Sequence, residues 1–225
     1  MDMKKTKTVF LTGASRGIGK AIYKQLKKES YKVIAPTRQE LDLSNSISLY
    51  RYIDAHKNLK VDILINNAGI NFPQWIDELE DKNLRETLQI NLISPINLIR
   101  AFVPHMKKQK WGRIVNISSM FGIVARGKQV PYAASKHGIN GATKALALEL
   151  GPYNVLVNSV CPGFVKTDLV LRNPPEKLAA LAKDVPLGRL AEPEEIAELV
   201  FFLISKKNTY ITGECILIDG GFTAR

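Results

Sequence analysis

A tyrosine and a lysine four residues apart, Tyr132 and Lys136, are the side chains of this sequence whose spacing most directly suggests chemistry. Positions i and i+4 of a helix share one face, so we expect the Lys136 ammonium to lie beside the Tyr132 phenol. Such a cation would lower the phenol pKa from its usual value of about 10. The phenol could then protonate a carbonyl oxygen, or deprotonate an alcohol, near neutral pH. The same spacing also occurs on solvated surface helices, so it does not decide the matter alone.

Length and composition favour a single domain with a well-filled core. The chain has 225 residues, of which 45% are hydrophobic, and this length suits one α/β domain over residues 1–225. No apolar run approaches the ~20 residues that span a bilayer, and the N-terminal segment has no signal-peptide pattern. Cys161 and Cys215 have neither metal-ligand spacing nor a disulfide pattern, which predicts a cytoplasmic protein without a metal site.

The net charge of +11 suggests an anionic partner. The basic residues are scattered and are not interleaved with aromatic residues, so the pattern argues against nucleic-acid binding. A phosphate-bearing cofactor or an acidic carrier protein would explain the charge equally well, and so would solubility alone.

Short apolar runs alternate with longer segments of helical periodicity throughout the chain. This alternation predicts a Rossmann-type, doubly wound α/β fold, with a parallel sheet covered by helices on both faces. The expected strands are Thr8–Leu11, Lys32–Ala35, Asp62–Ile65, Arg113–Ile117, Val155–Val160 and Ile216–Ile218. The expected helices are Ile18–Lys28, Ile47–His56, Leu79–Lys108, Tyr132–Leu150 and Glu194–Ile204.

A glycine-rich turn joins the first expected strand to the first helix. In Thr12-Gly13-Ala14-Ser15-Arg16-Gly17-Ile18-Gly19, three glycines would allow a tight turn, a close approach of a pyrophosphate and close packing of the helix on the sheet. The phosphates would face the free N–H groups and the positive dipole end of the helix. The position of the turn between strand and helix makes it a strong indication of dinucleotide binding.

These segments, taken in order, resemble the short-chain dehydrogenase/reductase family over essentially the whole chain. The resemblance rests on the glycine-rich turn, Asn66-Asn67-Ala68-Gly69, Ile90-Asn91-Leu92, Asn116-Ile117-Ser118-Ser119, the Tyr132/Lys136 pair and Cys161-Pro162-Gly163 with Thr167. The C-terminal third, with Gly188-Arg189-Leu190-Ala191-Glu192-Pro193 and Tyr210-Ile211-Thr212-Gly213, is most similar to the 3-oxoacyl-[acyl-carrier-protein] reductase group.

The resemblance implies four catalytic residues. Tyr132 would be the general acid, and Lys136 would lower its pKa and bind the nicotinamide ribose. Ser119 would hydrogen-bond the substrate oxygen; we choose it over Ser118 because the family's serine lies thirteen residues before the tyrosine, and we expect Ser118 to bond locally. Asn91 would hold a water in a proton relay, although a core amide at a helix kink fits the same place.

The resemblance also implies a nicotinamide dinucleotide site built from several loops. Asn67 to Gly69 would stabilise the central strand and line the adenosine ribose, and Thr167 would bond the nicotinamide carboxamide. The implied cofactor residues are Gly13, Ser15, Arg16, Gly17, Ile18, Gly19, Arg38, Asp42, Leu43, Asn67, Ala68, Gly69, Tyr132, Lys136, Pro162, Gly163, Val165 and Thr167.

The end of the second strand predicts NADP(H) rather than NAD(H). An acidic residue there would bond the ribose 2′-hydroxyl and repel a 2′-phosphate, but this chain has Thr37 followed by Arg38. Arg38 and Arg16 together could bind a 2′-phosphate through charge-assisted hydrogen bonds. Arg38 could alternatively be a solvated loop residue.

One helix of the family pattern is expected to be missing. The segment from Thr37 runs directly into Leu41-Asp42-Leu43, whereas a parallel neighbour strand needs a crossover of about a dozen residues. We therefore predict no helix between strands 2 and 3 of the pattern, and at most a short edge bridge at Leu41–Leu43. Asp42 and Leu43 could still hold the adenine, and Ser44 is expected to be the N-cap of the next helix.

The substrate is the least readable feature of the sequence. Relatives place a mobile lid at about residues 168–187, and apolar residues such as Phe121 and Phe164 would line the pocket. The substrate could be an acyl thioester on an acidic acyl carrier protein, attracted by Lys107, Lys108, Lys110 and Arg113, which could also be a solvated helix end. A small ketone, sugar-derived or cyclic carbonyl compound is the alternative.

The resemblance further implies an assembly and leaves a second class of function open. Related chains pair through the helices that correspond to Leu92–Met106 and Tyr132–Leu150, which implies a homotetramer, or a homodimer. A non-catalytic protein that senses the dinucleotide is the competing hypothesis, and the presence of all four polar catalytic residues argues against it.

Overall fold

Six parallel strands form one sheet in this computed structural model, which describes residues 6–224. The strand order is β2-β1-β3-β4-β5-β6, so the chain reverses its direction of travel between β1 and β3. The strands are β1 (Thr8–Leu11), β2 (Lys32–Ile34), β3 (Ile63–Asn66), β4 (Gly112–Ile117), β5 (Val155–Pro162) and β6 (Cys215–Ile218). The predicted doubly wound α/β fold is therefore confirmed.

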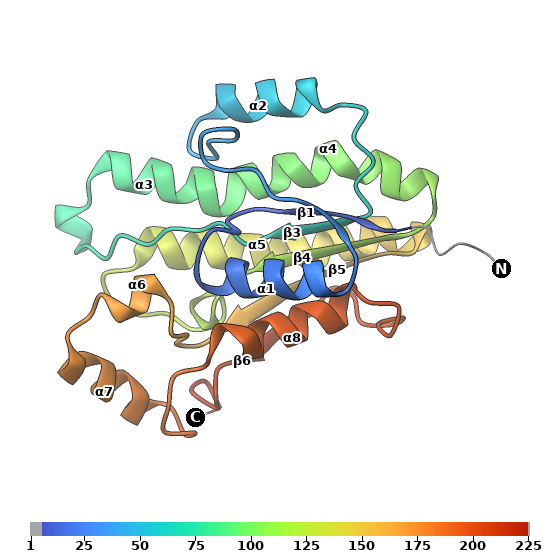
Figure 1. Cartoon of the computed structure of the whole chain (residues 1–225). Helices are drawn as coiled ribbons and strands as arrows, with labels where there is room; N and C mark the ends of the chain where they lie inside the picture. Colours follow the sequence, from blue (N-terminus) through green and yellow to red (C-terminus); the bar gives the residue numbers. More distant parts are fainter. Residues whose placement is uncertain (1–5, 225) are drawn as a thin grey trace.

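Helices cover both faces of the sheet (Figure 1). On one face pack α1 (Gly17–Lys28) and α8 (Pro193–Ile204), and on the other pack α2 (Ser46–Ala55), α4 (Ser94–Lys108) and α5 (Val130–Leu150). Because strand side chains alternate between faces, Val9 and Leu11 join the core under α1 and α8 while Phe10 joins the opposite core. No helix within residues 6–224 has the length and apolarity to cross a membrane.

The single helix predicted over Leu79–Lys108 is divided into three parts. It consists of α3 (Asp81–Leu88), a π-helical turn η2 (Gln89–Ile93) and α4. A π-turn widens a helix by one residue and often marks a functional site. Three single 3₁₀ turns also occur, at η1 (Ile76–Glu78), η3 (Met120–Gly122) and η4 (Gly151–Tyr153).

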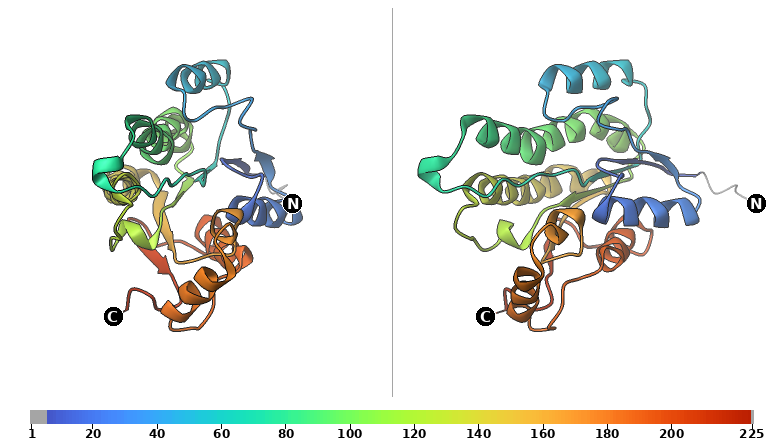
Figure 2. Two further views of the ribbon diagram at one scale, coloured as in Figure 1. Left: turned by 90° about the vertical axis from the view of Figure 1, so that its left-hand side faces the viewer. Right: turned by 60° about the vertical axis from the view of Figure 1, so that its left-hand side comes forward.

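Two short helices, which the sequence analysis did not predict, lie in the expected lid segment. They are α6 (Asp168–Leu171) and α7 (Pro175–Asp184). Both stand apart from the layers around the sheet, at the end of the molecule away from the N-terminus (Figure 2). An isolated bridge between Val165 and Ala191 joins the two ends of the segment that contains α6 and α7.

The missing helix is confirmed, and the segment that replaces it is a single turn. Thr37 and Glu40 form a reciprocal cap: the Glu40 carboxylate accepts from the Thr37 N–H (2.7 Å) and hydroxyl (2.9 Å), and the N–H of Glu40 points back to that hydroxyl. The N–H of Leu41 bonds the Thr37 carbonyl, which closes the turn. Leu41–Leu43 forms neither a strand nor a bridge, so β2 is the edge strand of the described sheet.

The predicted N-cap of α2 was wrong by one residue. Asn45, and not Ser44, caps the helix, because its side-chain oxygen accepts from the N–H groups of Ile47 (2.9 Å) and Ser48 (3.1 Å). The hydroxyl of Ser44 instead donates to Asp42 at 2.7 Å. Ser44 and Asn45 are both residue types that cap helices. The hydroxyl of Ser44 is engaged by Asp42, and Asn45 caps α2.

The cap gives a direct test of this assignment. Asn45→Ala leaves two N–H groups of α2 without their acceptor and should lower the free energy of unfolding by about 1 kcal/mol, as cap losses do. Ser46→Ala, which changes an exposed residue of the first turn, is the matched control and should change it by less than about 0.5 kcal/mol. Urea denaturation of both variants measures the difference, and equal effects would refute the assignment.

Candidate active site

The glycine-rich turn between β1 and α1 has the geometry of an anion-binding site. Gly13 has a positive φ of 69°, and a Cβ on Gly19 would lie 2.0 Å from the carbonyl oxygen of Gly13. Helix α1 starts after Arg16 with no side-chain cap and with no acidic residue in its first turn. Its first N–H groups and its positive dipole end are therefore free to face a phosphate. A dinucleotide pyrophosphate fits these residues.

Asn67 fixes this turn to the end of β3. Its side-chain amide donates to the carbonyl oxygens of Thr12 (3.0 Å) and Gly13 (2.9 Å). The Thr12 hydroxyl accepts in return from the N–H groups of Asn67 and Ala68. Asn67 and Ala68, which were expected to stabilise the central strand, thus hold the glycine-rich turn (the phosphate loop) in place. The sequence analysis gave no role to Thr12, whose position directly before the first glycine was the available signal.

Ser119, Tyr132 and Lys136 meet where β4 ends and α5 begins. The Lys136 ammonium donates to the carbonyl oxygen of Ile117 at 2.8 Å and lies 5.6 Å from the centre of the Tyr132 ring. The Ser119 hydroxyl accepts from the N–H of Phe121 at 3.1 Å and lies close enough to Tyr132 to lower its pKa. Ser118 turns the other way, and its hydroxyl donates to the Lys136 carbonyl at 3.3 Å. Ser118 was expected to bond locally, but it instead joins the end of β4 to α5.

The expected lowering of the Tyr132 pKa was wrong. Burial raises the pKa of Tyr132 above its usual value, and the nearby Ser119 hydroxyl opposes this only in part. Burial also lowers the pKa of Lys136 to about 8. The sequence spacing placed the two groups correctly, but it could not show that Lys136 is buried and Tyr132 half-buried, and desolvation disfavours the charged form of each.

Asn91 lies in the π-turn, and its side chain fixes the loop after β3. Its amide oxygen accepts from the Ile70 N–H, and its amide nitrogen donates to the Ile70 carbonyl, each at 2.9 Å, and to the Ser135 hydroxyl at 3.1 Å. Gly69 lies between Asn91 and Lys136, because a Cβ there would be 3.3 Å from the asparagine oxygen and 3.6 Å from the ammonium. The side chain of Asn91 therefore matches the alternative interpretation, a core amide at a helix kink.

The segment after β5 passes directly beside the phosphate loop. A Cβ on Gly17 would lie 2.9 Å from the methyl group of Thr167, so Thr167 borders the start of α1. Pro162 pairs with Ile218 of β6, and the N–H of Gly163 bonds the same residue. Val165 is buried and pairs with Ala191. Of the other expected cofactor residues, Ser15 and Arg16 are exposed on the turn, and Ile18 packs into the core under it.

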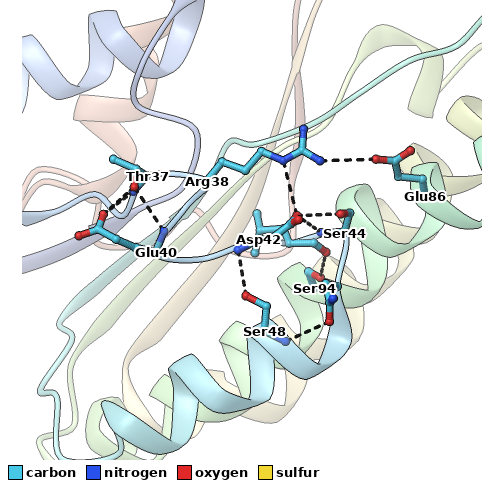
Figure 3. A network of polar contacts seen from close by, with 10 residues as sticks. Thr37, Arg38, Glu40, Asp42, Ser44, Ser48, Glu86 and Ser94 are labelled. Carbon is cyan, nitrogen blue, oxygen red and sulfur yellow. Dashed lines mark hydrogen bonds and ion pairs between the residues drawn. The ribbon is translucent and has the colours of Figure 1, made fainter.

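The expected adenosine end is a polar network after β2 (Figure 3). Asp42 accepts from the N–H and hydroxyl of Ser44, and Leu43 is held by a hydrogen bond from Ser94 to its carbonyl oxygen at 2.7 Å. Arg38 is exposed and lies 3.7 Å from Asp42 and 3.9 Å from Glu86 of α3. Partial burial alone would raise the pKa of Asp42, but the Ser44 hydrogen bonds and the Arg38 charge lower it. Glu86 was missed, because nothing in the sequence links it to Arg38.

The basic residues suggested for a carrier protein lie elsewhere. Arg113 is 3% exposed and donates to the carbonyl oxygens of Gly112 and Asn208. It stands at the beginning of β4, whereas Ser119 follows the end of that strand. Arg113 therefore cannot attract a carrier, and the neighbouring Lys107 instead covers the ring of Tyr153. Lys107 and Arg113 are close to Ser119 in the sequence, but β4 lies between them. The extended strand places its two ends far apart in space.

An aromatic row lines the region between Ser119 and the C-terminus. Phe121 contacts Phe164 edge-on, with centroids 6.3 Å apart, and Phe164 contacts Phe222 at 5.4 Å. Phe121 and Phe164 were expected near the pocket. Phe222 was not, because no sequence pattern shows that the C-terminal segment returns to the site.

Comparisons with known proteins agree with this geometry. A family model described as enoyl-(acyl carrier protein) reductase matches residues 39–223. The chain is 36% identical to the 3-oxoacyl-[acyl-carrier-protein] reductase of Aquifex aeolicus, over 96% of each chain. It is 34% identical to the D-beta-hydroxybutyrate dehydrogenase of Rhizobium meliloti, over 98% of this chain and 100% of the relative.

A solved structure with the same fold contains a bound cofactor. The structure of 4-hydroxyisoleucine dehydrogenase complexed with NADH matches with a TM-score of 0.91 at 32% identity, covering 98% of this chain and 100% of that one. The residues that form the two faces and the carboxyl edge of the sheet thus lie on a fold that holds a nicotinamide dinucleotide in that protein.

The buried ammonium predicts an unusual pH dependence of stability. With a folded pKa of about 8 and an unfolded value of about 10.4, the unfolded chain binds the extra proton between these pH values. Burying the charged ammonium lowers the free energy of unfolding by its full amount below pH 8. This cost disappears as the pH rises through the unfolded pKa, so the protein becomes more stable. Lys136→Met removes this term, so its stability relative to wild type should fall by about 3 kcal/mol between pH 7 and 10.5.

Urea denaturation of both proteins at the two pH values measures this, since other titrating groups cancel in the difference. Lys82→Met, which removes an ammonium from an exposed position of α3, is the control and should show no such change. A stability difference for Lys136→Met that does not depend on pH would contradict a depressed pKa.

Proposed function

The chain belongs to the short-chain dehydrogenase/reductase family and interconverts a carbonyl and an alcohol with a nicotinamide cofactor, and we propose that it reduces a ketone to a secondary alcohol with NADPH. The observation that carries the proposal is the convergence of Ser119, Tyr132 and Lys136 at the carboxyl edge of the sheet, beside the phosphate loop. In this proposal residues 168–187 act as a lid over the substrate.

Each polar residue has a separate task in the proposed reaction. When bound, the reduced nicotinamide supplies a hydride to the carbonyl carbon. Ser119 donates a hydrogen bond to the carbonyl oxygen and fixes its position, and Tyr132 gives that oxygen its proton. Because burial keeps the phenol protonated, Tyr132 suits the role of acid in reduction. Lys136 then supports the phenolate and binds the nicotinamide ribose.

Asn91 completes the proposed proton relay through its backbone. Both ends of its side-chain amide are already bonded to Ile70 and Ser135. We therefore assign the water of the relay to the carbonyl oxygen of Asn91 in the π-turn. This water would return a proton to Tyr132 by way of the cofactor ribose and Lys136.

The proposed substrate is a 3-oxoacyl compound. Support comes from the names of two relatives, a 3-oxoacyl-[acyl-carrier-protein] reductase and a D-beta-hydroxybutyrate dehydrogenase, which both refer to oxygen on the same carbon of an acyl chain. The apolar row of Phe121, Phe164 and Phe222 would suit the acyl part. An acyl carrier protein remains part of the proposal as carrier of the thioester, and a sugar-derived or cyclic ketone is the alternative.

We propose a homotetramer, or a homodimer, as the assembly. The support is that α4 and α5 expose large apolar side chains although both helices already contribute to the core, with Ile96 at 41% and Leu148 at 82% exposure. Analytical ultracentrifugation distinguishes these assemblies from a monomer, which would contradict the proposal.

Removal of one oxygen atom tests the proposed catalysis. Tyr132→Phe should lower kcat about 10²- to 10⁴-fold, the usual contribution of a positioned acid, without loss of NADPH binding. NADPH oxidation is measured with a panel of 3-oxoacyl thioesters, diketones and sugar-derived ketones. Tyr210→Phe, at a residue that is 95% exposed, is the matched control and should retain activity. Cofactor binding without turnover of any carbonyl would favour a dinucleotide sensor instead.

The proposed preference for NADP(H) depends on Arg16 and Arg38. No acidic residue follows β2 directly, and the nearest carboxylate, Glu40, is engaged by Thr37 on the side away from the Arg38 guanidinium (Figure 3). Arg38→Gln should weaken NADPH about tenfold, since a hydrogen bond to a charged group is worth about 1.5–3 kcal/mol, while NADH binding changes little. Fluorescence titration measures both, and tighter NADH than NADPH binding by the unaltered protein would refute the preference.

A further inference from the structure

Arg38 lies between two carboxylates without a hydrogen bond to either. Its Nε lies 3.7 Å from Asp42 and its Nη2 lies 3.9 Å from Glu86. Both separations exceed hydrogen-bond range, and the Arg38 side chain is 75% exposed. Figure 3 shows the side chain extended from the turn after β2 towards α3. These ion pairs therefore orient Arg38 without using its N–H groups.

The two carboxylates differ in what else they do. Asp42 is committed to its own loop, because it accepts from the N–H (2.9 Å) and the hydroxyl (2.7 Å) of Ser44. Among residues 6–224, the Glu86 carboxylate forms its ion pair with Arg38, and 23% of its side chain is exposed. Its charge is therefore partly desolvated and is available to Arg38.

We propose that Glu86 is a specificity-determining residue that competes with the cofactor 2′-phosphate for Arg38. The inference rests on the proposed NADP(H) function and adds a residue to it. A phosphate that carries about two negative charges and bonds a guanidinium in bidentate fashion outcompetes one carboxylate at 3.9 Å. That exchange leaves Glu86 unpaired beside a phosphate of like charge. NADH carries no 2′-phosphate, so the Arg38–Glu86 pair persists when it binds.

The missing outer helix explains why α3 can supply this residue. The turn over Thr37–Glu40 replaces a longer connection and directs Arg38 across the loop to α3. Glu40 cannot play the same part, because its carboxylate is bonded within the turn. Glu86 thus narrows the preference for NADPH over NADH, and its removal should widen it.

The experiment compares cofactor affinities of five proteins by fluorescence titration with NADPH and with NADH. They are the unaltered chain, Glu86→Gln, Asp81→Asn, Arg38→Gln and the double variant Arg38→Gln/Glu86→Gln. Glu86→Gln should tighten NADPH about two- to fivefold, the usual worth of an exposed ion pair, and leave NADH unchanged. The gain should shrink at high salt. Asp81→Asn removes an equal charge from the same helix, next to Arg85 at 3.9 Å, and should alter neither affinity.

The double variant separates this inference from its alternatives. The effect of Glu86→Gln should vanish in the Arg38→Gln background, because the competition acts through Arg38. An equal change for NADPH and NADH, an effect that persists without Arg38, or the same effect from Asp81→Asn would overturn the proposal. Failure of the proposed function has a different signature: no turnover of any carbonyl, or tighter NADH binding by the unaltered chain, while the ratio of affinities still reports on Glu86.

Discussion

The hydrogen bond from the Lys136 ammonium to the carbonyl oxygen of Ile117 is the interaction on which the site depends. It joins α5 to the last residue of β4, and so it fixes Tyr132 on the helix relative to Ser119 just beyond the strand. A buried ammonium is costly unless it is bonded, and within residues 6–224 the carbonyl of Ile117 is its hydrogen-bond acceptor. The desolvated Lys136 ammonium thus lies at the edge of the sheet, where a bound dinucleotide would supply further hydrogen-bond acceptors.

A second set of bonds places the phosphate loop in register with that pair. Asn67 and Thr12 exchange hydrogen bonds between the ends of β3 and β1, and Asn91 holds Ile70 in the next loop. The strands end at a common edge because the sheet is parallel, so side chains that follow three different strands meet there. The short connection after β2 forms one border of this site, and there Arg38 lies near Asp42 and Glu86 of α3.

Local patterns predicted the fold and most of the site, and long-range packing decided the rest. The glycine-rich turn, the spacing from Ser119 to Tyr132 and the short segment after Thr37 each carry a backbone requirement that can be read along the chain. The direction of the Tyr132 pKa could not be read, because burial depends on segments distant in sequence. The same limit explains the wrong prediction for Arg113. Its sequence context suggests a surface cation, but its guanidinium donates to the carbonyl oxygen of Asn208, which is distant in the sequence.

In the proposed reaction a hydride passes to a carbonyl carbon held against Ser119 and Tyr132. The most direct measurement uses NADPH deuterated at C4 of the nicotinamide, on either face in turn, with a 3-oxoacyl thioester, and locates the label by mass spectrometry and NMR. We expect one deuterium on the new carbinol carbon when one face is labelled and none when the other face is labelled. Alcohol without deuterium from both labelled cofactors, deuterium from both faces, or no alcohol from any carbonyl offered would contradict this.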